Sequence, residues 1–161
     1  MKITLDYGTT GLELDLAGLN ARVLRPNYPP PLDDESAGFL QSVRNPIGSL
    51  PLKQKISATD RVAIAISDIT RPLPTERLLG WLFEELSHVP KKNFVIISGT
   101  GTHRTNTKEE WLCMVGEDVF ANCHCIDHEG TNSGTLVLGG RSPFGYDVFS
   151  TGNTWRRISE S

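Results

Sequence analysis

The sequence predicts an α/β domain with a mostly parallel sheet and helices on its faces, a Rossmann-like arrangement, preceded by a small amino-terminal β-hairpin region. Two apolar runs, at residues 62–66 and 94–97, are short and bounded by polar residues, as buried parallel strands usually are. A stretch with helical spacing of apolar residues follows each run. Because parallel strands need a long crossover, usually a helix, this alternation favours a doubly wound parallel sheet with right-handed connections.

The chain has the length and composition of one globular domain. Its 161 residues are 38% hydrophobic and 22% charged, whereas a disordered chain is poorer in apolar residues and more strongly charged. This length allows one substantial hydrophobic core. We therefore expect a single α/β domain over residues 1–161.

Charge and hydropathy argue against two classes of partner. The formal net charge of -3 gives no basic field for a phosphate backbone, so nucleic-acid binding is not expected. No apolar run approaches the roughly 20 residues that a membrane-spanning helix needs, so no membrane contact is expected. The first residues lack the apolar core of a signal peptide, which predicts a cytoplasmic location where the three cysteines stay reduced.

The amino-terminal segment predicts β-structure followed by a connector. Residues 2–6 and 11–16 alternate apolar and polar residues around Gly8–Gly11, as the two strands of a hairpin do. Residues 21–24 are expected to add a third strand. The proline-rich residues 25–34 should form an extended connector, because proline ends regular structure.

Two short helical segments should follow this connector. Asp33 or Asp34 can cap a helix that runs to about Val43, and residues 45–48 stop it. A second helical turn is expected at residues 50–56.

The central part of the chain predicts two strand and helix units in succession. Residues 60–68 form the first strand, and Thr75 is expected to cap the helix after it. Residues 93–98 form the second strand, and Thr107 opens a helix with an acidic first turn. The apolar face of the first helix should pack on the sheet and comprises Leu78, Leu79, Trp81, Leu82 and Leu86.

Three further strands are expected to continue the sheet toward the carboxyl end. They lie at residues 123–126, 135–138 and 146–149. The residues from Thr154 onward follow neither a helical nor a strand pattern.

Polar residues stand after the first buried strand, where ligands bind in parallel sheets, near a reversal of strand order. In segment 67–74, Arg71 could clamp a substrate carboxylate, and Asp68 could orient a hydroxyl or an imidazole. The alternative is a proline-stiffened turn with a local ion pair, and the residues taken alone favour it.

A glycine-rich loop with one histidine follows the second strand, at residues 98–107. His103 could act as a general acid or base, because histidine titrates near neutral pH. Taken alone, such a histidine is more often exposed or capping. The glycine spacing does not match the dinucleotide fingerprint, so a nicotinamide cofactor is not expected, while a phosphate cradle stays open.

Thiols and imidazoles also cluster in residues 123–128. Cys123, Cys125 and His128 could together contribute to a metal site. No second cysteine pair completes such a site, so buried structural cysteines are the favoured interpretation.

Three segments match, in order and spacing, the motifs of one known family. They are Asn45–Ser49, Ser67–Pro74 with the pattern Asp-x-Thr-Arg-Pro-x-Pro, and Gly99–Arg104 followed by Thr107–Glu110. Gly116–Asp118 is a weaker fourth match. On these motifs the chain resembles the amino-terminal domain of the nickel-pincer lactate racemase family over most of residues 1–150.

The resemblance implies a chemistry. Members of that family racemise or epimerise 2-hydroxy acids by moving a hydride from C2 to a nickel pincer cofactor derived from a pyridinium nucleotide, while two histidines alternate as acid and base. His103 matches one of those histidines. Asp68 and Arg71 match residues that position this histidine and the substrate. No cofactor contact or metal ligand of this chain is assigned.

The resemblance also implies what the chain lacks. In the family the second histidine, the lysine that tethers the cofactor and the histidine that binds nickel lie beyond the region covered by this sequence. We therefore expect the chain alone to bind no cofactor and to complete no racemisation without a missing C-terminal half or a partner subunit.

Two other functions stay open at this stage. The chain could be a stand-alone binding module for a hydroxy acid or a phosphate-bearing ligand, which the unmatched residues 151–161 favour slightly. It could instead be a metal-binding protein that uses Cys123, Cys125 and His128, which elemental analysis would decide.

Overall fold

The computed structural model describes residues 1–152, which divide into a unit of residues Met1–Asp33 and a unit that begins at Asp34. The tail from Thr154 onward lies outside the described residues. The first unit holds β1 (Lys2–Leu5) and β2 (Leu12–Asp15), which pair antiparallel and confirm the predicted hairpin. The third strand predicted at residues 21–24 is wrong, because this segment pairs with neither strand and Leu24 is 77% exposed.

The second unit opens with α1 (Glu35–Arg44) and α2 (Leu52–Lys55). The predicted cap is confirmed, since the Asp34 carboxylate accepts a hydrogen bond of 2.9 Å from the backbone N–H of Ala37. Arg44 donates two hydrogen bonds of 2.9 and 2.7 Å to Glu85, which ties α1 to the helix of residues Thr75–Glu85.

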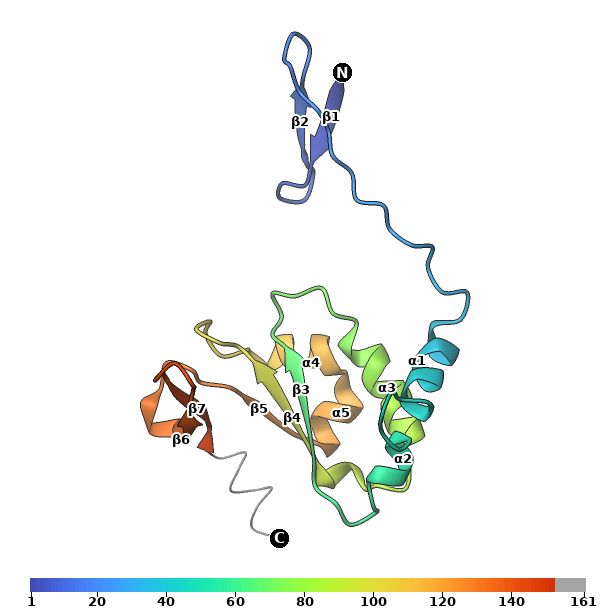
Figure 1. Cartoon of the computed structure of the whole chain (residues 1–161), viewed down its shortest axis with the longest axis vertical. Coiled ribbons are helices and arrows are strands. Elements are labelled where there is room, and N and C mark those ends of the chain that lie inside the picture. Colours follow the sequence, from blue (N-terminus) through green and yellow to red (C-terminus); the bar gives the residue numbers. More distant parts are fainter. Residues whose placement is uncertain (153–161) are drawn as a thin grey trace. The chain divides into compact units, whose positions relative to one another are not determined.

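The centre of the fold is a parallel sheet of β3 (Val62–Ser67), β4 (Phe94–Gly99) and β5 (His124–Asp127), seen in Figure 1. The strand order is β3-β4-β5, and both pairings are parallel, which confirms the predicted α/β class. Strand order does not reverse among these three strands, contrary to the prediction. The common carboxyl edge of the sheet, rather than a reversal, therefore gathers the loops.

Helices α3 (Thr75–Glu85), α4 (Lys108–Val115) and α5 (Glu117–Asn122) connect these strands. The prediction that Thr75 caps α3 is wrong, because Pro74 holds the cap position and Thr75 is the first helical residue. Helix α5 was not predicted, because six residues are too few to show a helical period. The 3-10 turns η1 (Lys91–Asn93) and η2 (Ser133–Thr135) precede strands.

The hydrophobic core lies between the helices and one face of the sheet. Alternate residues of β3 and β4 contribute to it, because successive strand side chains point to opposite faces. Phe94 and Ile96 are fully buried there, and Ile66 is nearly so. The buried members of the core are Ile66, Leu79, Leu86, Val89, Phe94, Ile96, Trp111, Met114, Val115 and Val119.

The last two strands do not continue the parallel sheet, contrary to the prediction. β6 (Leu136–Arg141) and β7 (Asp147–Thr151) form a separate antiparallel sheet. The connection between them is a tight turn, in which the Ser142 N–H donates to the Tyr146 carbonyl at 2.7 Å. A connection this short can only join antiparallel neighbours, since a parallel pair needs a long crossover.

Within residues 1–152, every helix is too short or too polar to cross a lipid bilayer.

Candidate functional site

Loops that follow all three parallel strands meet at the carboxyl edge of the sheet. Asp68 comes directly after β3, His103 lies in the glycine-rich loop after β4, and Asp127 is the last residue of β5. Hydrogen bonds join these three segments to one another. The edge is therefore a connected set of polar side chains.

Asp68 and His103 form the central pair. The Nδ1 atom of His103 lies 2.6 Å from Oδ2 of Asp68. The Thr70 hydroxyl donates to the other carboxylate oxygen at 2.7 Å. The hydrogen bond from His103 lowers the pKa of Asp68 most, and the hydrogen bond from Thr70 lowers it further. Together they outweigh the burial of the carboxyl group, which raises the pKa. Asp68 is therefore an ionised, fully engaged carboxylate at neutral pH.

The pair leaves one imidazole nitrogen for chemistry. The Asp68 side chain is 6% exposed, whereas that of His103 is 51% exposed. Because Nδ1 faces a carboxylate, the proton of the neutral ring belongs on Nδ1, and Nε2 keeps its lone pair. An imidazole held in this tautomer by a buried carboxylate is the arrangement of a general base.

Arg71 lies near this pair in the chain but does not contact it. Its backbone N–H donates to the Asp68 carbonyl at 3.1 Å, which closes a turn after β3. The side chain is exposed, and within residues 1–152 no hydrogen bond or ion pair engages the guanidinium. The local ion pair considered for this segment is therefore not formed, and the guanidinium could receive an anion.

Arg104, the other arginine of these motifs, is already engaged. It donates two hydrogen bonds of 2.7 Å to the Glu110 carboxylate. Thr107 and Glu110 also form a capping box at the start of α4, as the predicted helix start at Thr107 requires. The hydrogen bonds from Arg104, followed by the one from the Thr107 backbone, lower the pKa of Glu110 to about 2.

Replacing Arg104 by glutamine should raise the pKa of Glu110 toward 4.5, its ordinary value. A carboxyl group whose pKa is lowered by folding adds stability above its unfolded pKa, and this stability is lost as the pH falls through the folded pKa. The difference in unfolding free energy between native chain and variant should therefore shrink from pH 7 to about pH 2. Urea unfolding across this range measures it. Lys92→Gln is the control, and an equal pH dependence of both variants would contradict the assignment.

Two further residues of this edge were missed by the sequence analysis as members of the site. Asn106 and Asp127 share two hydrogen bonds, one of them 3.1 Å long from the Asn106 N–H. Asp127 also accepts a hydrogen bond of 3.3 Å from the Trp111 indole. One signal in the sequence could have identified Asp127 as a site residue. It directly follows the predicted strand 123–126, as Asp68 directly follows β3.

The Cys123–His128 segment does not form a metal site among the described residues. Within residues 1–152, no three His, Cys, Asp or Glu side chains converge as metal ligands. Cys123 and Cys125 pack against the hydrophobic core, and burial raises their thiol pKa values to about 11 and about 12. Both thiols are half-buried, and their packing supports the interpretation as structural cysteines.

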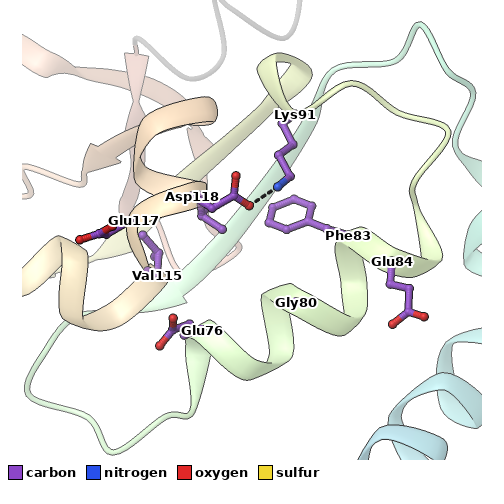
Figure 2. Close-up of a pocket in the computed structure, with 10 residues that line it drawn as sticks. Glu76, Gly80, Phe83, Glu84, Lys91, Val115, Glu117 and Asp118 are labelled. Carbon is purple, nitrogen blue, oxygen red and sulfur yellow. Dashed lines mark hydrogen bonds and ion pairs between the residues drawn. The ribbon is translucent and has the colours of Figure 1, made fainter.

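A separate pocket of about 520 Å³ lies among α3, α4 and α5, as Figure 2 shows. Its lining includes four carboxylates, from Glu76, Glu84, Glu117 and Asp118. The one ammonium group, of Lys91, pairs with Asp118 beside the Phe83 ring. An excess of carboxylates disfavours an anionic ligand in this pocket.

Comparisons with known proteins identify the family of the chain. The family model of the lactate racemase N-terminal domain matches residues 7–152. The lactate racemase of Lactiplantibacillus plantarum is 34% identical over 108 residues, covering 66% of this chain and 26% of that protein. The lactate racemase of Thermoanaerobacterium thermosaccharolyticum is 30% identical over 148 residues, covering 89% of this chain and 34% of that protein.

A solved structure resembles the whole fold. The structure of the lactate racemase apoprotein from T. thermosaccharolyticum superposes with a TM-score of 0.74 at 26% identity. The match covers 94% of this chain and 36% of that one. The chain therefore spans about a third, or less, of the length of the relatives that it matches.

Proposed function

Because the chain belongs to the lactate racemase N-terminal domain family, we propose that it carries one acid–base group of a 2-hydroxy-acid racemase site. The contact of 2.6 Å between Asp68 and His103 is the observation that supports this proposal most directly. It favours one tautomer of His103, with Nε2 unprotonated on a half-exposed ring, at the edge where parallel sheets bind ligands. The remaining two thirds of the relatives would supply the rest of the site.

In the proposed reaction, Nε2 of His103 takes the proton from the C2 hydroxyl when one enantiomer reacts and gives a proton to the C2 oxygen when the other enantiomer reacts. The second histidine that the resemblance implies, outside this chain, would have the complementary role. The Asp68 carboxylate stabilises the imidazolium that forms, because an ionised carboxylate at hydrogen-bond distance favours the charged ring. The Thr70 hydroxyl keeps this carboxylate oriented. Proton transfer by a positioned side chain typically accelerates a reaction by about 10²–10⁴-fold.

Arg71 is proposed to bind the carboxylate of the substrate. Its guanidinium is exposed and unengaged by residues 1–152, and its fork of donors matches a carboxylate. Arg104 is a poorer candidate, since Glu110 already occupies its donors. A 2-hydroxy acid held at Arg71 would present its C2 hydroxyl to a neighbouring imidazole.

We assign no residue of this chain to the nickel pincer cofactor that the resemblance implies. In the family the lysine that tethers the cofactor and the histidine that binds nickel lie beyond the region covered by this sequence, so we propose that the remainder of the complete enzyme holds it. A cytoplasmic location accords with three free thiols, at Cys113, Cys123 and Cys125.

Joining this chain to the portion of the T. thermosaccharolyticum racemase that follows the matched region tests the proposal. We expect the 161-residue chain alone to form no D-lactate from L-lactate and the chimera to do so. The unmodified relative is the positive control, and circular dichroism verifies that the chimera is folded.

Two results would contradict the proposal. Turnover by the chain alone would show that its own residues complete the site. A folded chimera that binds L-lactate without turnover would favour the stand-alone binding module instead.

A further inference from the structure

Asn106 contacts all three segments at the carboxyl edge of the sheet. Its amide oxygen accepts a hydrogen bond of 3.4 Å from the Ile69 N–H, one residue after Asp68. Its amide nitrogen donates to the hydroxyl of Ser98 in β4 at 2.9 Å and to the carboxylate of Asp127 in β5. One side chain thus connects the loop that carries Asp68, the strand that precedes His103, and the third strand.

Asp127 fixes the orientation of this amide. Its two carboxylate oxygens accept from the side chain and from the backbone of Asn106. The indole of Trp111, which is 5% exposed, donates to the same carboxylate. Because a carboxylate only accepts hydrogen bonds, the amide nitrogen of Asn106 must face Asp127. The amide oxygen then faces the Ile69 N–H.

The loop that carries His103 depends on anchors at its two ends. At its start Thr100 is 2% exposed, and its carbonyl accepts a hydrogen bond of 2.9 Å from the His103 N–H. The Thr100 hydroxyl donates to the His128 carbonyl. Asn106 is the anchor at the other end, while the residues between are exposed. A Cβ atom on Gly130 would overlap the Gly101 carbonyl, so the segment after β5 and this loop meet closely.

We propose that Asn106, oriented by Asp127, is a positioning residue that sets the contact between Asp68 and His103. Asn106 sets this contact because its side chain binds the loop that carries Asp68 and lies at the end of the loop that carries His103, and it attaches both loops to β4 and β5. The inference rests on the proposed function, since it assigns a catalytic use to that contact. Neither Asn106 nor Asp127 touches the reacting atoms in this scheme.

The test measures the tautomer of His103 in the purified chain, without any assay of turnover. Two-bond ¹H–¹⁵N spectra of the histidine-labelled chain, taken at about pH 9 where histidine is ordinarily neutral, distinguish the Nδ1–H from the Nε2–H form. The native chain should show Nδ1–H at His103. An imidazole without a partner prefers Nε2–H, so loss of the contact reverses the signal.

Asn106→Asp should lower the ratio of Nδ1–H to Nε2–H at His103 by about tenfold or more, as coupling within one hydrogen-bond network allows. It removes a donor and places a second carboxylate beside Asp127. The exchanged pair, Asn106→Asp with Asp127→Asn, should restore the ratio, because amide and carboxylate face each other again. Asn122→Asp is the matched control, since Asn122 also donates to an aspartate, Asp118 of α5, at 2.9 Å.

Thermal unfolding of each variant separates positioning from general stability. A folded Asn106→Asp chain with an unchanged His103 tautomer would overturn the inference, and so would an exchanged pair that folds without restoring it. Where Asn106→Asp does not fold, Asn106→Ala gives the same measurement. If that variant also fails to fold, Asn106 is required for folding, which overturns a role in positioning alone. Failure of the proposed function is separate, because it would appear in the turnover assays of the chain and of the chimera and not in the tautomer of His103.

Discussion

His103→Ala should lower kcat for lactate racemisation in the chimera by about 10²–10⁴-fold, the usual contribution of a positioned acid–base group. Removal of the imidazole leaves the substrate hydroxyl without a proton acceptor at this edge, while Arg71 and the fold are unchanged. KM should change less than kcat, since the ring acts mainly in the transition state. Initial rates of D-lactate formation over a range of L-lactate concentrations measure both constants.

His88→Gln is the matched control for this experiment. His88 follows α3, before β4 begins, so it lies toward the opposite edge of the sheet, where its Nε2 is 2.8 Å from the Ile56 carbonyl. Its replacement should leave kcat nearly unchanged. An equal loss of rate in both variants, or full activity of His103→Ala, would remove His103 from the proposed role.

Phe94→Ala should lower the free energy of unfolding of the second unit by about 3–5 kcal/mol, the usual cost of truncating a buried phenylalanine. Phe94 is 0% exposed and packs edge-on against Phe83, with ring centroids 4.9 Å apart. The loss combines the transfer of the ring with the cavity that it leaves. Urea unfolding followed by tryptophan fluorescence, to which buried Trp111 contributes, reports on this core.

Phe144→Ala provides the comparison for this core substitution. Phe144 is 87% exposed in the turn between β6 and β7, so its truncation should change stability by no more than about 0.5 kcal/mol. Similar losses for the two variants would show that the core identified between β4 and the helices does not dominate stability.

The central sheet could be predicted because its strands carry a strong local pattern. Residues 62–66 and 94–97 are apolar on both faces and bounded by polar residues, a pattern that few other structures produce. The caps at Asp34 and Thr107 could also be predicted, since a capping hydrogen bond is made within a few residues of the chain.

The errors arose where the outcome depended on distant partners. Residues 136–151 contain strands, as expected, but the sequence does not state whether a strand joins an existing sheet or pairs with its neighbour. Residues 21–24 carry an apolar pattern without a strand beside them. At Thr75, the prolines at positions 72 and 74 shift the start of α3 by one residue.

The candidate site was predicted only in part, for the same reason. The sequence indicates that Asp68 and His103 follow neighbouring parallel strands, and the fold brings their side chains together. It does not indicate that the Arg104 guanidinium is bound by Glu110, whereas the Arg71 guanidinium makes no hydrogen bond or ion pair within residues 1–152. The bridging role of Asn106 requires the register of three strands, which a single sequence does not specify.

The close approach of Gly130 to the loop of His103 bears on how divergent homologues should be classified. The site of a Cβ atom at position 130 is filled by the Gly101 carbonyl, with the His128 Nε2 a further 3.2 Å contact. A homologue could keep every proton-transferring residue and still displace this loop through one larger side chain there. Surveys that infer activity from an aspartate and a histidine alone would then count inactive proteins as racemases. A glycine at this position is a useful additional criterion for such surveys.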